Sequence, residues 1–570
     1  MGSGDLVPRM YGAFRGVDFR GEEINISRSP DSLNVWKDYK ETDSIRTRPE
    51  MKLLSSFTDT VYGVFFYTVG STDMMIVHSG TKLYKVIGEE KTVLFEGANE
   101  ARSNAFIYNN LWYFKDGQNY LQYNGATIGE VVGYIPTTSI GRKPFGGGTV
   151  YEDVNMFSDW RINTFASDGE SIDYYVDAQG LSDSADDWEV YVDGKRILFQ
   201  VEGETRNRIE HIDFEAGKFT FSIAPDKPLT EGQDNVTIKF RKPIDKNRIK
   251  NCTLLEVFDN RVFFSGNKDY PNTIWHCSLN DPTYCSDLDY YNEGLDNAAV
   301  KSMVAGNNAL WVFKEPSQAN TTVFYHTPTI DNEYGKIYPN THSSISTGCI
   351  GKAINFNDDI VFFSDRGMEG INGDITTEQA IAHRSSLVDR KLLAEPNYAD
   401  MLLEEWEGYL VVIIGNKAYL ADSRAVFTNE EHFEYEWFYW KLPKKITCAR
   451  VSKGVLYLGT EDGIYTLTDN ESNVESYWVT PKDKFSHPQY LKTTNKRGCL
   501  VEAIGDISVY AKTEKTDFEL IGNYNNIKDY FVSRIKRKKF KDIQLKFYST
   551  TRFSLETATL ECFIGGYTKR

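Results

Sequence analysis

The sequence lacks most features that would mark it as a membrane, secreted or zinc-binding protein. It contains no run of about 18 apolar residues, so no transmembrane helix is predicted. The first ten residues are polar and have no apolar core, so no signal peptide is expected. Its seven cysteines include no C-x-x-C pair, which argues against a zinc ribbon. Cys277 and Cys285 are close in sequence, but reduced, buried thiols are the expected state.

Basic residues are outnumbered: 64 Lys and Arg face 81 Asp and Glu, a net charge of −17. A surface that binds nucleic acid needs Lys and Arg to contact the phosphates, so the excess of acidic residues argues against such a surface. Two interpretations of the acidity stay open. It either keeps a large protein soluble or lines a channel along which DNA slides without sticking.

Catalytic and metal-ligating patterns are also missing. No HExxH, GxSxG or P-loop sequence occurs, and the eight histidines are scattered without ligand spacing. Ser364-Asp365-Arg366-Gly367 lacks the spacing of the repeated box of sialidase propellers and is interpreted as a turn. No catalytic, cofactor-binding or metal-binding residue is assigned, and the chain is not expected to be an enzyme. Paired carboxylates for glycoside hydrolysis stay open, because 81 acidic residues supply many chance pairs.

Short β-strands dominate what is present. Aromatic residues reach 14%, which favours pleated sheets. One hairpin pattern recurs, with two apolar strands around a tight two-residue turn whose residues tolerate positive φ. The clear copies are 105–114, 254–265, 302–313, 353–364, 402–413 and 448–459.

These copies recur at the spacing of propeller blades, about 40 to 55 residues between 254 and 459. Each blade of a β-propeller is a small antiparallel sheet, so the predicted fold is an all-β propeller of short antiparallel blades. A non-repeating array of β-sandwiches is the alternative. The aromatic run 433–440 is interpreted as a core strand of one blade rather than a stacking surface.

The repeat is interrupted by a stretch with different spacing. Hairpins around Asp193-Gly194 and at 214–221, with a strand at 234–240, predict an inserted β-sandwich that can be excised with the propeller still folding. The predicted division is 1–60 (N-terminal arm and first strands), 61–134 (first part of the propeller), 135–242 (inserted sandwich), 243–475 (second part of the propeller) and 476–570 (C-terminal β-rich segment).

Helical signal is weak, with one short helix expected within 376–393. The C-terminal segment carries a basic run whose members are candidate interaction residues: Arg534, Lys536, Arg537, Lys538, Lys539 and Lys541. A solvated strand edge protected by lysines explains them, and so does contact with an acidic neighbouring subunit or with DNA. At the other end, Leu6-Val7-Pro8-Arg9 resembles a protease site from an expression tag and equally reads as native sequence.

Several segments together resemble the tail nozzle or tail-hub family of short-tailed bacteriophages, also called head-stabilisation or tail accessory proteins. They are 14–18, 28–34 and 46–49 at the N-terminus, the loop 264–294, the strand 310–315, and the inserted sandwich. Glu50 follows Pro49 where the family more often has Gly. Within the loop, Asp281, Pro282 and Tyr284 are candidate interaction residues, although a rigid hydrogen-bonded turn also accounts for them.

The resemblance implies a structural virion protein. In that family, copies close into a ring, usually of six, that forms the terminal DNA-exit tube below the portal and adaptor proteins. The inserted domain docks tail fibres or spikes, and exiting genomic DNA touches the ring only transiently. The implied location is the phage tail, assembled in the host cytoplasm, without cofactors. The alternative is a host-surface adhesin propeller that binds carbohydrate or acts like a glycosidase.

Overall fold

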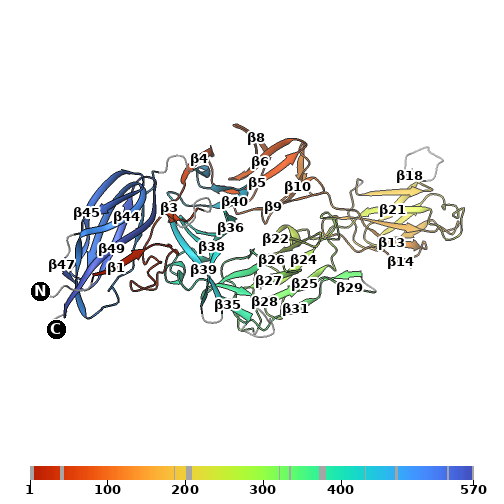
Figure 1. Ribbon diagram of the computed structural model, residues 1–570. Helices are drawn as coiled ribbons and strands as arrows, with labels where there is room; N and C mark the ends of the chain where they lie inside the picture. The colour runs from red at the N-terminus through yellow and green to blue at the C-terminus, as the bar shows by residue number, and fades with distance from the viewer. Residues whose placement is uncertain are drawn as a thin grey trace. The chain divides into compact units, whose positions relative to one another are not determined.

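The computed structural model describes residues 6–38, 44–184, 186–199, 208–319, 321–332, 335–371, 380–429, 432–468, 473–535 and 538–567. They divide into two compact units. Unit 1 comprises Met1–Arg102, Gly306–Tyr325 and Thr341–Arg570, and unit 2 comprises Ser103–Ala305 and His326–Asn340. Nearly all elements are strands (Figure 1). No helix of the described part is long and apolar enough to cross a membrane.

The fold is a β-propeller, built from seven four-stranded sheets within the described residues. Two of these sheets belong to unit 2. Their strands are β9 (Asn104–Tyr108), β10 (Leu111–Lys115), β11 (Tyr120–Tyr123) and β12 (Ile128–Glu130), and β22 (Leu254–Phe258), β23 (Arg261–Ser265), β24 (Thr273–His276) and β25 (Tyr290–Asn292). A further blade consists of β26 (Val300–Gly306), β27 (Ala309–Lys314), β28 (Val323–His326) and β31 (Asn340–His342).

Unit 1 contains four complete blades. Their strands are β5 (Val61–Val69), β6 (Thr72–Ser79), β7 (Lys82–Ile87) and β8 (Glu90–Glu96); β32 (Ala353–Phe356), β33 (Asp359–Ser364), β34 (Gly367–Ile371) and β35 (Ile381–His383); β36 (Leu402–Trp406), β37 (Tyr409–Ile414), β38 (Lys417–Asn429) and β39 (His432–Lys441); and β4 (Glu50–Ser56) with β40 (Cys448–Ser452), β41 (Val455–Gly459) and β42 (Gly463–Thr468). In the last blade, β4 pairs with β42 across more than 400 residues of sequence, from Glu50 opposite Thr468 to Ser56 opposite Gly463.

The hairpin turns have the backbone that the sequence predicted. Both central residues take positive φ in all six repeated hairpins, for example Asn109 (47°) and Asn110 (60°), or Asp259 (50°) and Asn260 (57°). Positive φ at both positions gives the turn a twist that matches the flanking strands. The predicted core strand is also confirmed, because Trp437, Phe438 and Trp440 of β39 are buried.

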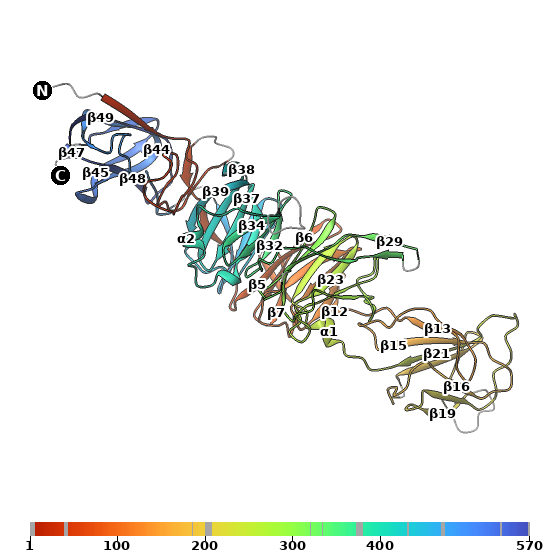
Figure 2. The same ribbon diagram turned by 90° about the horizontal axis from the view of Figure 1, so that it is seen from below.

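The inserted β-sandwich of unit 2 has two layers (Figure 2). The larger sheet has the order β14-β13-β15-β21-β17-β18, and the smaller has the order β16-β20-β19. All its fully buried core residues lie between Phe165 and Phe240, so it has its own core. Its strands are β13 (Thr137–Arg142), β14 (Thr149–Val150), β15 (Trp160–Phe165), β16 (Asp173–Tyr175), β17 (Trp188–Val192), β18 (Lys195–Ile197), β19 (Ile209–Asp213), β20 (Lys218–Phe221) and β21 (Val236–Arg241).

The C-terminal segment forms a ten-stranded sheet with N-terminal strands, which we call the C-terminal β-domain. Its central strand β44 (Tyr490–Thr513) pairs with five others. The remaining members are β1 (Leu6–Tyr11), β2 (Val35–Trp36), β3 (Ile45–Thr47), β43 (Ser476–Val479), β45 (Thr516–Ile527), β46 (Tyr530–Ser533), β47 (Lys538–Phe540), β48 (Ile543–Ser549) and β49 (Phe553–Tyr567). The strand β1, which covers the tag-like residues, pairs along its whole length with β49.

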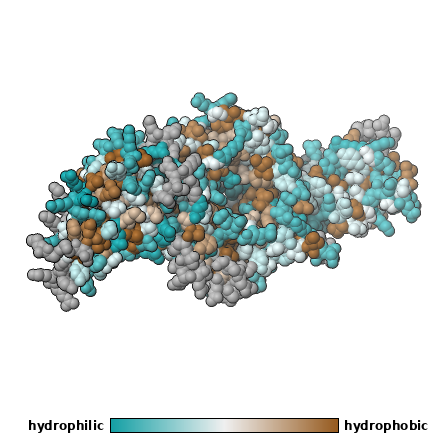
Figure 3. All heavy atoms as spheres, viewed as in Figure 1, coloured by the Kyte–Doolittle hydropathy of each residue, from teal (hydrophilic) through white to brown (hydrophobic). Residues whose placement is uncertain are grey.

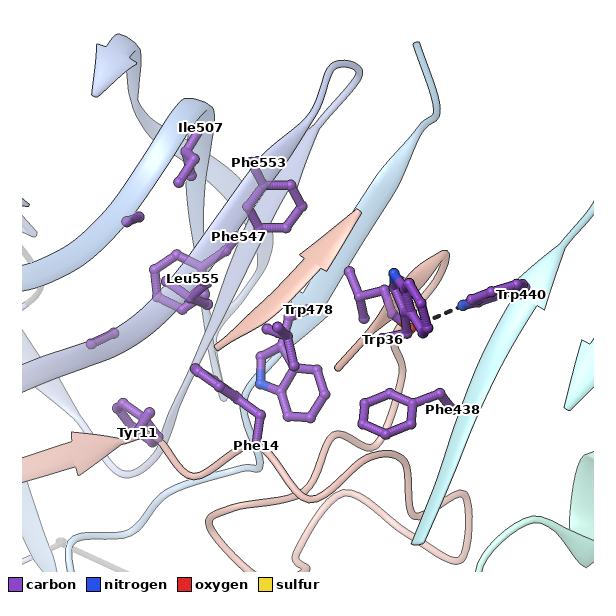
Figure 4. Close-up of a cluster of buried hydrophobic side chains, with 14 of the residues drawn as sticks. Tyr11, Phe14, Trp36, Phe438, Trp440, Trp478, Ile507, Phe547, Phe553 and Leu555 are labelled. Carbon is purple, nitrogen blue, oxygen red and sulfur yellow. Dashed lines mark hydrogen bonds between the residues drawn. The ribbon is translucent and has the colours of Figure 1, made fainter. Parts of the chain in front are cut away.

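One hydrophobic core joins this domain to the neighbouring blades of unit 1 (Figure 4). Phe547 and Leu555 of the C-terminal strands belong to it, as do Phe438 and Trp440 of β39. Trp36 lies in the same core and contacts Trp440 edge-on, with ring centroids 5.7 Å apart. The N-terminal residues are therefore structural in this unit.

Two minor hairpin strands and two one-turn helices complete the described elements. The strands are β29 (Thr329–Asp331) and β30 (Gly335–Ile337), and the helices are α1 (Asn247–Lys250) and α2 (Asp389–Leu392), with a 3-10 turn at Tyr398–Asp400. The helix expected within 376–393 is present only as α2, because residues 380–383 join strand β35 and its flank; residues 376–379 lie outside the described part.

Candidate functional site

The loop containing Asp281, Pro282 and Tyr284 is a rigid turn in unit 2. The backbone N–H and hydroxyl of Thr283 donate to Asp281 Oδ1 at 2.8 and 2.6 Å. The carbonyl of Pro282 accepts the Tyr120 hydroxyl at 3.0 Å. Tyr284 donates its hydroxyl hydrogen to the Asp153 carbonyl at 2.9 Å. Burial, and to a smaller extent the nearby carboxylates, raise the pKa of Tyr284 well above the ordinary value. The three candidate residues therefore face the protein's own backbone.

The partner of this loop is Asn155, which the sequence did not single out. Its side-chain amide donates to the carbonyls of Tyr134 and Thr283, both at 2.8 Å. Its Oδ1 accepts the backbone N–H groups of Phe157 (3.1 Å) and Cys285 (3.0 Å). Asn155 is fully buried, and these four bonds use all the hydrogen-bonding capacity of its amide. We call Asn155 and the 281–285 loop the Asn155 anchor.

The anchor lies between two passages of the chain through the inserted sandwich. The chain enters the sandwich at β13 and β14, returns to the propeller at residues 153–158, and enters the sandwich again at β15. Met156 and Phe157 are buried with Trp275 and Phe264 in the core of the unit 2 blades. The anchor therefore holds the two short connections on either side of Asn155, which are two of the four between the sandwich and those blades.

Asn155→Ala is expected to lower the free energy of unfolding by about 2 kcal/mol, because it leaves two part-buried carbonyls and two buried N–H groups without their side-chain partner. Urea titration monitored by tryptophan fluorescence measures the change. The exposed Asn525→Ala, in β45, is the matched control and should change stability by no more than about 0.5 kcal/mol. An Asn155 variant as stable as this control would contradict the structural role of the anchor.

Two of the N-terminal residues that carry the family resemblance, Asn34 and Arg48, are also buried. Asn34 takes positive φ (56°), and its amide bridges two segments of unit 1. Its Nδ2 donates to the Glu475 carbonyl at 2.8 Å, and its Oδ1 accepts the Lys441 N–H at 2.8 Å. Arg48 donates to Asn34 Oδ1 (3.0 Å) and to the carbonyls of Pro49 (2.8 Å) and Lys441 (3.1 Å). Burial lowers the pKa of Arg48 to about 10. We call Asn34 and Arg48 the N-terminal clasp.

The candidate basic run is only partly within the described residues: Lys536 and Arg537 lie outside them. Arg534 is exposed, and Lys538 begins β47, which pairs with β44. The carbonyl of Lys539 accepts Lys515 Nζ at 2.8 Å, and the backbone N–H of Lys541 donates to Glu514 at 2.9 Å. The described part of the run thus continues the sheet of unit 1, whereas the 281–284 loop belongs to unit 2.

Two histidines form polar clusters of the kind found in active sites. In unit 2, His326 Nε2 lies 2.8 Å from Glu293 Oε1, and its Nδ1 lies 2.9 Å from the Tyr338 carbonyl. In unit 1, His383 Nε2 lies 2.6 Å from Asp389, and its Nδ1 lies 3.3 Å from Glu369. Both nitrogens of each ring are engaged, so neither imidazole has a nitrogen left for a substrate or metal ion. Among the described residues, no group of three His, Cys, Asp or Glu could hold a metal ion.

His383 gives a testable pH dependence. Burial alone would lower its pKa, but the carboxylates of Asp389 and Glu369 outweigh burial and raise the pKa to about 10. A pKa raised in the folded state stabilises the fold fully below the unfolded value of about 6.5, and the stabilisation is lost as pH rises towards 10. The difference in melting temperature between wild type and His383→Gln should therefore shrink between pH 6.5 and 10. A constant difference would contradict this assignment, and His487→Gln serves as the control.

The inserted sandwich contains a cavity of about 380 Å³ at one edge of its two layers. It lies where β18 of the larger sheet approaches β19 of the smaller. Trp188 and Phe199 contribute aromatic rings, which meet edge-on with centroids 5.9 Å apart, while Arg196 and His211 contribute polar groups. No sequence pattern predicted this cavity, because its walls come from separate strands.

Comparisons with known proteins add little beyond fold. No family model matches the chain, and no curated protein matches it. Similar solved structures include BamB from Moraxella catarrhalis (9% identity, 74% of this chain and 98% of that chain, TM-score 0.32) and YCF48 bound to D1 peptide (6%, 74% and 96%, 0.33). An exo-beta-1,3-galactanase from Phanerochaete chrysosporium is also similar (8%, 90% and 100%, 0.21).

The strand order, the Asn155 anchor and the N-terminal clasp define the class of protein. It is a β-propeller protein that carries an inserted β-sandwich and a C-terminal β-domain. In this protein, the candidate contact residues Asp281, Pro282 and Tyr284 bond within their own unit.

Proposed function

We propose that this protein is a structural subunit of a bacteriophage tail, one copy of a ring that forms the nozzle or hub through which DNA leaves the virion. The observation that carries the proposal is the N-terminal clasp. Its residues belong to the segments that resemble the nozzle family, and they tie propeller strand β39 to Glu475, the residue before β43 of the C-terminal β-domain. These side chains are buried and hydrogen-bonded within the chain, so they stabilise the fold and do not bind a small molecule. Such a role suits a subunit of a rigid conduit.

The proposed partners follow from the same resemblance. They are further copies of the chain, portal and adaptor proteins, and tail fibres or spikes at the inserted sandwich, with transient contact to exiting DNA. The protein would then be located in the virion after assembly in the host cytoplasm, and it would have no enzymatic role.

Antibodies raised against the sandwich residues 135–242 test the proposal. Immunogold electron microscopy of purified phage particles from the source of the sequence should label one end of the tail, and mass spectrometry should detect the chain in the same particles. Its absence from purified virions would overturn the proposal.

The sandwich cavity favours a second candidate, a carbohydrate-binding adhesin. Aromatic faces next to polar groups, as at Trp188, Arg196 and His211, are the usual lining of a sugar site. A glycan array probed with wild type and Trp188→Ala separates the two candidates. Glycan binding that depends on Trp188, by a protein absent from virions, would favour the adhesin.

A further inference from the structure

Charge is distributed very unevenly along the chain. Residues 476–570 contain 18 Lys and Arg but 10 Asp and Glu, a net charge of +8. This leaves 46 basic and 71 acidic residues for 1–475, a net charge of −25. A molecule divided in this way attracts further copies of itself in a head-to-tail arrangement, with the basic end of one copy against the acidic part of the next.

The C-terminal β-domain also has an apolar outer face. An antiparallel sheet with one solvated face normally alternates buried apolar and exposed polar residues. Here Cys499 and Val501 of β44 are fully buried, yet Leu500 between them points outward and is 41% exposed. The next outward apolar position on the same strand, Ile504, is 51% exposed. Apolar side chains therefore occupy both faces of this strand.

The neighbouring strand extends this face. Val532 of β46 lies directly opposite Leu500, and Tyr530 lies opposite Glu502. Val532 is 46% and Tyr530 is 64% exposed, whereas Phe531 between them is buried. We call Leu500, Ile504, Tyr530 and Val532 the outer apolar face. On the side of this domain seen in Figure 3, apolar side chains gather in patches between hydrophilic ones.

Basic side chains border the outer apolar face. Lys496 and Arg497, at the bulge that precedes Leu500, are exposed, and so is Arg534, two residues after Val532. Two nearby carboxylates accept hydrogen bonds from neutral groups and keep their charge: Glu502 accepts the Thr557 hydroxyl at 2.8 Å, and Glu561 accepts the Asn495 amide at 2.7 Å. The rim carries both signs, with Glu502 opposite Tyr530 and the exposed Asp529 beside it, but basic residues are in excess. An exposed apolar centre with a charged rim is typical of a protein interface.

We infer that the outer apolar face and its basic rim bind a second copy of this chain, through an acidic surface formed by residues 1–475 of that copy. The inference rests on the proposed function, and it specifies which surface the copies use. A nucleic acid would suit the basic rim but not the exposed Leu, Ile and Val side chains at the centre. The two contacting surfaces differ, so the contact is heterologous and can propagate around a ring.

Sedimentation velocity of the full-length protein over a range of concentrations tests the inference. Wild type should associate reversibly, and the association should weaken as salt is raised, because the rim contributes by charge. The double variant Leu500→Asp and Val532→Asp should weaken association about tenfold or more. The matched control, Leu295→Asp with Ile330→Asp, replaces two exposed apolar residues of unit 2 and should associate as wild type does.

A second pair of variants tests the rim. Arg497→Glu with Arg534→Glu should weaken association several-fold, whereas Lys52→Glu with Lys195→Glu should not. Circular dichroism melts confirm that each variant is folded. Wild type that stays monomeric up to its solubility limit would overturn the inference, and so would association that all variants leave unchanged. Binding of short duplex DNA or anionic vesicles that depends on Leu500 and Val532, without self-association, would also overturn it. Detection in virions is a separate measurement, so the proposed function can survive this failure.

Discussion

Excision of residues 135–242, with a short Gly-Ser linker in their place, is expected to destabilise the rest of the protein by about 3 to 5 kcal/mol. The sequence predicted that this range could be removed cleanly. In the structure, the deletion also lowers stability, because the range includes Asn155 of the anchor. It also includes Met156 and Phe157, which lie in the core of the unit 2 blades. Loss of a buried aromatic side chain and of a buried hydrogen-bond hub each costs a few kcal/mol.

A second deletion provides the control. It removes 137–150 and 160–241 through two short linkers and keeps 151–159, so that the sandwich is lost while the anchor stays. This variant should unfold within about 1 kcal/mol of the parent in urea titration. The sandwich alone should also fold cooperatively, because its core is its own. Equal stability of the two deletion variants would show that the anchor contributes nothing.

Arg48→Met is expected to lower the free energy of unfolding of unit 1 by about 3 kcal/mol. Methionine keeps much of the side-chain volume but cannot donate to Asn34, to the Pro49 carbonyl or to the Lys441 carbonyl. Removing a buried charged donor from its acceptors typically has a cost of this size. The loss should appear in urea titration and as increased proteolysis near the N-terminus.

Arg15→Met is the matched control, because Arg15 is in the same N-terminal segment but its side chain is 54% exposed. It should change stability by no more than about 0.5 kcal/mol. Arg48→Lys should recover part of the loss, because its ammonium group can still donate but cannot reach all three acceptors at once. If Arg48→Met and Arg15→Met are equally mild, the clasp does not hold the propeller strands to the C-terminal β-domain.

The propeller could be predicted because its signals are local. Turn pairs such as Asn109-Asn110 require positive φ at both positions, and alternation of apolar residues defines the strands on either side. The inserted sandwich was also visible, because its hairpin at Asp193-Gly194 interrupts the repeat. Each of these signals lies within about ten residues of sequence, so no tertiary information was needed.

The candidate sites were predicted less well, for a physical reason. The motif residues were interpreted as possible contacts with partners, but a hydrogen-bonding side chain does not reveal its partner from sequence. Asp281 and Tyr284 bond within their own unit, and Asn155, 126 residues before Asp281, completes that cluster. The exposure of Leu500 and Val532 was not predicted either, because an apolar residue in a strand is expected to be buried.

The sequence by itself determined the all-β class, the blade repeat, the place of the insertion and the turns, since each depends on backbone preferences of adjacent residues. The tertiary structure alone decided which strands share a sheet, as when β4 pairs with β42, and which polar residues become buried hubs. It also decided which apolar residues of the C-terminal β-domain face outward. Those outcomes depend on contacts between residues far apart in the chain, where packing and the need to satisfy every buried polar group select one arrangement.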